Sequence, residues 1–283
     1  MHTTLITTAE LAARLGAPDL VVCDVRHDLA QPDSWGEAEY RNAHIPGALF
    51  VHLDRDLSAR KTGINGRHPL PTPEAAAAMS GRLGIDSGKQ VVVYDQGGGM
   101  FAARMWWMLH WLGHDNAALL DGGFAQWISE GRATSADVPA PRGARFTIRG
   151  VKPTVNATGV AASLARRSLT LIDARVPERF RGEIEPLDPV AGHIPGARNR
   201  PYQNNLKPDG TFKPPAELRA EFTTLLAGSP ASDVVHQCGS GVTACHNLLA
   251  MEIAGLPPTR LYPGSWSEWC ADPARPVARG SVS

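Results

Sequence analysis

The 283-residue chain has few cysteines and no excess of charge of either sign. Its four cysteines, Cys23, Cys238, Cys245 and Cys270, are too sparse for a disulfide scaffold, so we expect free thiols in a reducing compartment. Lys and Arg together number 28, and Asp and Glu together also number 28. No long-range field therefore favours nucleic acid or an anionic membrane surface, and we expect the partners to be small molecules or proteins.

Long apolar runs are also absent. No stretch approaches 18 uninterrupted apolar residues, and the N-terminal "MHTTLITTAELAARLG" lacks a basic start followed by an apolar block. We therefore expect a cytoplasmic protein that is not inserted in a membrane. The 28 glycines and 23 prolines indicate a folded chain with many turns.

The sequence contains one pattern twice. "CDVRHDLAQPDSWGEAEYRNAHIPGA" begins at residue 23 and "IDARVPERFRGEIEPLDPVAGHIPGA" at residue 172, and each holds D-x-R followed by H-I-P-G-A. Asp24 and Asp173 are separated by 149 residues, as are His44 and His193. We interpret the two histidines as turn and packing residues. Later segments pair in the same way, "VVVYDQGGGMFAARMWWML" with "VVHQCGSGVTACHNLLAM". The chain is thus predicted to be two copies of one domain.

The predicted boundaries follow from the repeat and from composition. A Pro-, Gly- and Arg-rich stretch without clear periodicity separates the copies, as expected of a linker. We predict a first domain at 1–135, a linker at 136–154 and a second domain at 155–283.

Short β-branched runs alternate with helix-like segments in both copies. The runs are "LVVCDVR", "VVVYD", "LTLIDAR" and "DVVHQC", and the helix-like segments include "TAELAARLG" and "FAARMWWMLHWLG". Alternation of this kind predicts the α/β class, with a mainly parallel sheet flanked by helices in each of the two tandem domains. Active residues then belong at the carboxyl ends of strands.

One cysteine differs from the others in its surroundings. Cys238 ends an apolar run and is followed by Gly239-Ser240-Gly241 and a helix-like segment, while the first copy has Asp95 at the corresponding place. Glycines allow the backbone N–H groups of such a loop to point inward, and together with the helix N-terminus they favour negative charge on the sulfur. The pattern predicts a thiolate nucleophile in the second copy alone.

Three other interpretations of this cysteine remain open. Cys238 could be a buried small apolar residue. A cysteine phosphatase needs an arginine six residues after the nucleophile, but Ala244 stands there, so phosphate would lose its bidentate partner. A metal site from His236, Cys238, Cys245 and His246 would lack any C-x-x-C or H-x-x-x-H pair.

The motifs together resemble a known family. The paired "HIPGA" segments, the loop "CGSGVTA" and the closing "LYPGSWSEW" are similar to the tandem-domain rhodanese family, and the loop resembles that of its 3-mercaptopyruvate sulfurtransferases. The resemblance implies a rhodanese-like fold for both domains and a catalytic cysteine in the second. It also implies that the first domain is a non-catalytic copy that contributes to the site, which lies between the two. It implies a sulfur atom that passes from a donor to the cysteine as a persulfide and then to an acceptor.

The resemblance also assigns roles to individual residues. The matching loop positions are Gly239, Ser240, Gly241, Val242, Thr243 and Ala244, of which the resemblance places Gly239, Gly241, Val242 and Thr243 in donor binding. A catalytic set of Ser, His and Asp beside the thiol corresponds to Ser240, His68 and Asp54. A histidine oriented by a carboxylate would move the protons that the reaction requires.

For the donor carboxylate the resemblance implies two arginines after the second D-A-R strand. Arg179 matches the first, and its guanidinium can bind a carboxylate with two hydrogen bonds. Where these enzymes tend to have E-P-R, this chain has Leu187 and Asp188, as thiosulfate-using relatives do. We interpret Arg181 as surface charge.

The expected activity is transfer of sulfur from 3-mercaptopyruvate through a Cys238 persulfide to a thiol or cyanide, with release of pyruvate and without any metal or organic cofactor. A thiol acceptor such as thioredoxin fits the resemblance. A thiosulfate sulfurtransferase on the same scaffold is the nearest alternative. A sulfur-carrier or regulatory module without independent turnover is a second.

Overall fold

The computed structural model describes residues 1–166 and 168–281, which form two compact units. Unit 1 contains Met1–Ala59, Pro71–Lys152 and Lys207–Phe212. Unit 2 contains Arg60–Leu70, Pro153–Leu206 and the chain from Lys213 onward. The segment Arg60–Leu70 belongs to the first sequence repeat, yet it packs within unit 2.

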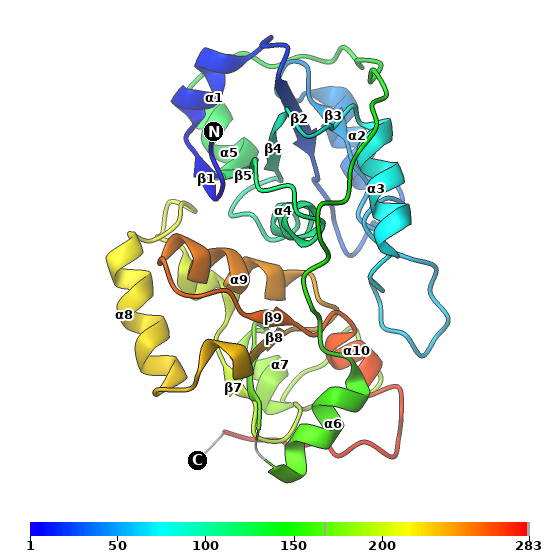
Figure 1. Cartoon of the computed structure of the whole chain (residues 1–283), viewed down its shortest axis with the longest axis vertical. Coiled ribbons are helices and arrows are strands. Elements are labelled where there is room, and N and C mark those ends of the chain that lie inside the picture. Colours follow the sequence, from blue (N-terminus) through cyan, green and yellow to red (C-terminus); the bar gives the residue numbers. More distant parts are fainter. Residues whose placement is uncertain (167, 282–283) are drawn as a thin grey trace. The chain divides into compact units, whose positions relative to one another are not determined.

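Unit 1 is built on a five-stranded sheet in the order β1-β5-β4-β2-β3, in which every described pairing is parallel. Helix α1 begins at a capping box in which Thr7 and Glu10 exchange hydrogen bonds, which satisfies N–H groups that a helix start leaves open. The elements of unit 1, coloured blue to green in Figure 1, are β1 (Leu5–Ile6), α1 (Thr8–Arg14), β2 (Leu20–Asp24), α2 (Trp35–Asn42), β3 (Leu49–Phe50), α3 (Pro73–Arg82), β4 (Gln90–Tyr94), α4 (Ala102–Trp111), β5 (Ala117–Leu120) and α5 (Gly123–Ser129).

Unit 2 repeats this plan with a four-stranded parallel sheet in the order β7-β6-β8-β9. Its elements, coloured green to red in Figure 1, are α6 (Ala157–Arg166), β6 (Thr170–Asp173), α7 (Pro177–Arg181), β7 (Arg198–Asn199), the 3-10 helix η1 (Tyr202–Asn205), α8 (Pro215–Leu226), the 3-10 helix η2 (Ala231–Asp233), β8 (Val234–Gln237), α9 (Thr243–Ile253), β9 (Arg260–Leu261) and α10 (Ser265–Trp269). In place of a fifth strand, the backbone of Val155 donates to Leu261 at 2.9 Å.

Helices cover both faces of each sheet. In unit 1 the core on one face joins α1 and α5 to alternate residues of the strands, as Leu11 and Trp127 illustrate. In unit 2 the corresponding core joins α6 and α10, while α8 and α9 lie on the other face (Figure 1). The α4 sequence "AARMWWMLHW" is buried along its whole length. This layered arrangement confirms the predicted α/β class with two mainly parallel sheets.

The repeated D-x-R and HIPGA motifs form the same structure in both units. Arg26 binds the carboxylate of Asp24 and donates to the carbonyl of Ala43, directly before His44. Arg175 does the same with Asp173 and the carbonyl of Gly192, directly before His193. Each buried ion pair thus ties the end of a central strand to the HIPGA segment, which explains why the motifs recur together.

The two motif histidines are packing residues, as predicted. His44 stacks on Tyr40 with ring centroids 4.0 Å apart, and His193 stacks on Phe180 at 3.9 Å. Nδ1 of each ring lies within hydrogen-bond distance of the backbone carbonyl of the residue on which it stacks.

Among the helices of the described residues, none has the length and apolar character needed to cross a bilayer.

Candidate active site

Cys238 is the first residue after β8, at the carboxyl end of a central strand of unit 2. Its side chain is 1% exposed. The N–H of Gly241 donates to Sγ at 3.2 Å, and the backbone N–H of Cys238 donates to Oγ of Ser265 at 3.1 Å. The carbonyl of Cys238 accepts from Trp266 at 3.0 Å. The thiol is therefore held in a fixed position, with a backbone donor directed at the sulfur.

Two special backbone positions shape this loop. Gly241 has φ of +76°, and a Cβ there would lie 2.2 Å from the carbonyl oxygen of Pro263, so only glycine fits. Ser265 also adopts a positive φ, +54°, which is strained for a residue with a side chain. Its hydroxyl both accepts from Cys238 and donates to the carbonyl of Tyr262 at 2.9 Å. The strained backbone of Ser265 thus belongs to a residue whose hydroxyl contacts the nucleophilic residue directly.

Two of the other cysteines are in surroundings that keep them protonated. Burial raises the pKa of Cys270 to about 11 and that of Cys23 well above its usual range. Cys245 lies buried on α9, where its Sγ donates to the carbonyl of Gly241 at 3.3 Å. Cys23 and Cys270 therefore remain neutral thiols near pH 7, as expected of structural cysteines.

In unit 1, Asp95 occupies the position that Cys238 has in unit 2, directly after the corresponding strand β4. Its carboxylate accepts from four backbone N–H groups at 2.8 to 3.1 Å, those of Gly97, Gly99, Phe101 and Ala102. The glycine-rich turn after this strand therefore binds an anion in the first copy, and in that copy the anion is part of the chain.

Two of the predicted catalytic side chains meet at the Cys238 loop. Nδ1 of His68 lies 2.7 Å from Oγ of Ser240, and both residues are buried. His68 comes from the segment Arg60–Leu70, so it reaches unit 2 from the first sequence repeat. Asp54 belongs to unit 1, where one of its oxygens lies 4.0 Å from Nε2 of His27. Its predicted role beside His68 stays a prediction.

The predicted donor-binding loop residues are in place around the thiol. Gly239 and Gly241 flank Ser240, the carbonyl of Gly239 accepts from Ser267 at 2.9 Å, and Thr243 begins helix α9 with Val242 before it. Their roles in donor binding stay predictions. The four residues considered for a metal site have other contacts: His236 Nε2, for example, lies 3.2 Å from Sδ of Met251.

Arginine and carboxylate side chains alternate beside the loop. Arg175 contacts Glu185 at 3.5 Å, and Glu185 binds Arg179 at 2.6 Å. Arg179 contacts Asp188 at 3.2 Å, and the other oxygen of Asp188 binds Arg67. Burial alone would lower the pKa of Arg175, but Asp173, Glu185 and the nearby Cys238 raise it. A permanent cation thus stands within electrostatic range of the thiol.

Several of these residues were not found from the sequence. Arg67, Glu185, Ser265 and Ser267 contact the loop or its arginines, yet none stands in a motif that names its role. Ser267, whose hydroxyl accepts from the N–H of Arg67 at 2.9 Å, is 200 residues from it in sequence. Arg67 lies within "RHPLP" beside His68, and Ser265 and Ser267 lie within "GSWSEW", so membership of these segments is the one signal that could have indicated these three. Glu185 stands in neither segment. Arg181, by contrast, pairs with Glu183 at 2.6 Å on the surface, as predicted.

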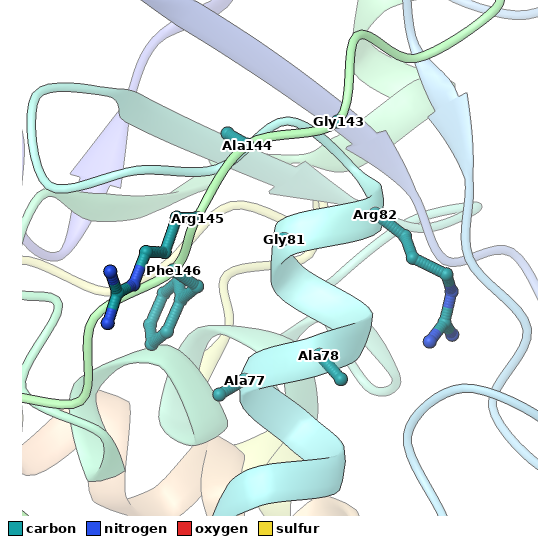
Figure 2. Close-up of a pocket in the computed structure, with 8 residues that line it drawn as sticks. All are labelled: Ala77, Ala78, Gly81, Arg82, Gly143, Ala144, Arg145 and Phe146. Carbon is teal, nitrogen blue, oxygen red and sulfur yellow. The ribbon is translucent and has the colours of Figure 1, made fainter.

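A separate open pocket lies in unit 1 between α3 and the extended segment that follows the first repeat (Figure 2). Figure 2 shows Arg82 and Arg145 pointing away from each other on opposite sides of it. The pocket contains none of the predicted site residues and brings no charges together. Its lining residues are Ala77, Ala78, Gly81, Arg82, Gly143, Ala144, Arg145 and Phe146.

The sequence pattern of the Rhodanese-like domain matches residues 7–130 and 156–272, which together are most of the chain. The chain belongs to the rhodanese family. Both copies of the repeat are therefore rhodanese-like domains, one in each matched segment.

Relatives of this rhodanese-family chain align along nearly its whole length. A Pseudomonas aeruginosa protein named "Probable 3-mercaptopyruvate sulfurtransferase" is 50% identical over 279 residues, 98% of each chain. A Mycobacterium tuberculosis protein named "Putative thiosulfate sulfurtransferase SseB" is 42% identical over 285 residues, again 98% of each. The crystal structure of the 3-mercaptopyruvate sulfotransferase SseA from Escherichia coli superposes with a TM-score of 0.81 at 33% identity, covering 94% of this chain and 100% of that one. The chain is a tandem-domain sulfurtransferase of this family.

Proposed function

We propose that the protein transfers sulfur from 3-mercaptopyruvate through a persulfide on Cys238 to a thiol or cyanide acceptor. The Cys238 thiolate attacks the donor sulfur, an S–S bond forms and the donor C–S bond breaks. The electron pair of that bond goes to carbon as the enolate of pyruvate, which takes the proton released by the donor thiol. In the second step the acceptor attacks the outer sulfur and regenerates the thiolate.

The hydrogen bond from Gly241 to Cys238 Sγ is the observation that carries this proposal, because it directs a backbone donor at the reacting atom. The buried loop keeps that donor fixed, so no reorganisation is needed when negative charge develops. Arg175 adds a cation in electrostatic range. Among the cysteines, Cys238 combines the strand-end position with these charge-stabilising groups.

His68 and Ser240 supply the proton transfer in this proposal. Their 2.7 Å contact gives a path by which the donor thiol proton reaches the enolate carbon. Asp54 is proposed to orient His68, as the family resemblance implies. No step needs a metal or an organic cofactor.

Donor choice rests on two features. Neither Gly239 nor Ser240 places a cation in the loop itself, which suits a donor with one carboxylate better than doubly charged thiosulfate. The 50% identical relative carries the mercaptopyruvate name. Leu187 and Asp188, and the 42% identical relative named for thiosulfate, favour thiosulfate as the second candidate.

Turnover with each donor against cyanide tests the proposal, with unaltered protein and Cys238→Ser compared. We expect kcat/KM for 3-mercaptopyruvate to exceed that for thiosulfate at least tenfold, about 1.4 kcal/mol of transition-state preference. Mass spectrometry should find one added sulfur on Cys238 after donor treatment. A preference for thiosulfate would show that thiosulfate, and not 3-mercaptopyruvate, is the donor. The absence of any sulfur adduct would show that the protein is a binding module without turnover.

A further inference from the structure

Asp188 is the residue that makes the donor-binding side of the loop unusual. In the sequence it brings a negative charge to the segment where the resemblance implies an arginine. Its side chain is 4% exposed, and its two oxygens bind two different guanidinium groups, those of Arg67 and Arg179. The negative charge of Asp188 is therefore paired with two arginines and does not repel an incoming anion as an unpaired carboxylate would. It joins two arginines that are 112 positions apart in the chain.

Both guanidinium groups lie against Gly239, the residue directly after the nucleophile. A Cβ built on Gly239 would lie 2.8 Å from Nη2 of Arg67 and 3.5 Å from Nη1 and Nη2 of Arg179. The backbone of Arg67 is fixed independently, by its N–H bond to Ser267 at 2.9 Å. Glycine at position 239 thus admits the Arg67 guanidinium to a place within one residue of Cys238, whereas the distances to Arg179 are ordinary van der Waals contacts that a Cβ would tolerate.

Several donors of these arginines are unused among the residues that the structure describes. Nε of Arg67 is buried and has no hydrogen-bond partner there. Asp188 binds Nη1 of Arg67, so Nη2 also lacks an acceptor. Arg179 directs Nε and Nη2 to Glu185 and Asp188, which leaves its Nη1 open. The buried Nε of Arg67 is costly to leave without an acceptor, and an anion with two oxygens can accept from it and from the two open Nη groups, which are not buried.

We propose that Arg67 is the second donor-binding arginine, and that with Arg179 it holds the carboxylate of a 2-oxo acid donor beside Cys238. This inference rests on the proposed function. The planar fork of Arg67 keeps one edge on Asp188 and presents the other to the donor, as bidentate recognition of a carboxylate requires. Arg67 comes from the first sequence repeat, so this chain supplies from another segment the cation that Leu187 and Asp188 do not provide.

Steady-state kinetics of Arg67→Ala and Arg179→Ala with 3-mercaptopyruvate and cyanide test the assignment. We expect KM to rise about 10- to 100-fold in each variant with kcat changed less than about threefold, because the contact is made equally in ground and transition states. Arg67→Lys should recover part of the loss, since it keeps the charge without the fork. Arg181→Ala, an arginine of α7 paired with Glu183 on the surface, is the matched control and should behave as unaltered protein.

A donor-free reaction separates donor binding from a structural role. Inorganic polysulfide loads Cys238 without a carboxylate, and discharge of that persulfide to dithiothreitol, a neutral thiol acceptor, should be slowed far less than donor uptake in Arg67→Ala. Gly239→Ala provides a second variant if Arg67→Ala unfolds, because its methyl group displaces the Arg67 guanidinium without removing it. We expect a rise in KM there too.

Two results would overturn the assignment: an unchanged KM in Arg67→Ala, or discharge slowed as much as donor uptake. Failure of the proposed function gives a different result. If unaltered protein uses thiosulfate and not 3-mercaptopyruvate, the donor was wrong, and the same variants are then compared with thiosulfate. A rise in KM for thiosulfate would keep Arg67 as the residue that binds the donor anion, and an unchanged value would remove it.

Discussion

Reactivity in this protein is decided by what surrounds each side chain. Cys238 and Cys270 are both buried in unit 2, and burial raises the pKa of Cys270 to about 11 although a backbone hydrogen bond at Val190 lowers it. Cys238 differs in its place, at the end of a strand and at the start of a glycine-rich turn whose Gly241 N–H donates to the sulfur. The hydroxyl of Ser240 would be an ordinary turn residue without the ring of His68 at 2.7 Å. In the proposed mechanism this one contact makes Ser240 part of the proton path.

The Ser240–His68 pair predicts coupled losses of activity. Ser240→Ala and His68→Gln should each lower kcat/KM for 3-mercaptopyruvate by about 100-fold, and the double variant should lose little more than either one, because the two side chains act as a unit. Ser163→Ala removes a buried hydroxyl from α6 of the same unit and should leave activity unchanged. Effects that multiply in the double variant would show that the two groups act independently.

The glycine-rich loop singled out Cys238 in the sequence, and the family resemblance pointed to Ser240 and His68, whose catalytic roles stay predictions. Arg67 could not be assigned in this way, although it is adjacent to His68. Its role depends on Asp188 and Gly239, and no local pattern brings these three together. Motif recognition finds the residues that a family shares, whereas a compensating contact appears only when distant segments are placed in space.

At the scale of elements, the turn between a central strand and its helix is the functional part, and the two units use it differently. In unit 2 it surrounds a thiol, and in unit 1 it surrounds the carboxylate of Asp95 with four N–H donors. The strands and helices around both turns follow from their hydrophobic patterns. The two-residue strands β1, β3, β7 and β9 could not be predicted, because they are too short for any period and depend on their neighbours for pairing.

Removal of the Asp95 carboxylate should weaken unit 1. We expect Asp95→Ala to lower the free energy of unfolding by about 2 to 4 kcal/mol, since four N–H groups lose a charged acceptor. Urea denaturation followed by the fluorescence of the α4 tryptophans measures this. The control is Asp28→Ala, which removes a carboxylate that accepts one N–H on the surface and should cost less than about 0.5 kcal/mol. Equal losses would mean that the turn does not depend on its anion.

At the scale of the whole molecule, both units contain histidines that are held neutral. Burial lowers the pKa of His236 in β8 to about 3 and that of His110 in α4 to about 4. In the unfolded chain each would titrate near 6.5, so below that pH the unfolded state binds more protons. Stability is therefore complete above pH 6.5 and falls as the pH drops toward the folded values, by about 1.4 kcal/mol per pH unit for each histidine.

Replacement of one such histidine should reduce the acid sensitivity. His236 has no hydrogen-bond partner at Nδ1 among the described residues and a thioether at Nε2, so leucine loses little there. We expect the pH slope of the free energy of unfolding of His236→Leu, measured by urea denaturation between pH 6 and 4.5, to fall by about 1.4 kcal/mol per unit. Ile128→Leu, at an exposed position without a titratable group, should keep the full slope. An unchanged slope in His236→Leu would mean that this histidine does not titrate on unfolding.

The duplication could be predicted from two motifs that recur with one spacing, because each motif serves the same purpose in each unit. The sequence did not indicate that each repeat contributes a segment to the other repeat's unit. Arg60–Leu70 follows the first HIPGA motif in sequence but packs in unit 2, and Lys207–Phe212 lies in the second repeat but packs in unit 1. A boundary predicted from the sequence divides the chain at one place, whereas each packed unit is made of three separate segments.

The anion of Asp95 has a further consequence for the second copy. Counted in bonds from Cβ, its carboxylate oxygens lie one atom farther out than a cysteine sulfur, at the same remove as the outer sulfur of a persulfide. Unit 1 thus carries, as a permanent part of its chain, a carboxylate with the reach of the proposed intermediate, and the hydrogen bonds that it accepts from the described residues come from backbone N–H groups. When sulfur is loaded on Cys238, the negative charge moves outward by one atom, from Sγ to the outer sulfur of the persulfide. A turn built in this way can bind the charge at the new position with its backbone N–H groups, and no side chain has to move.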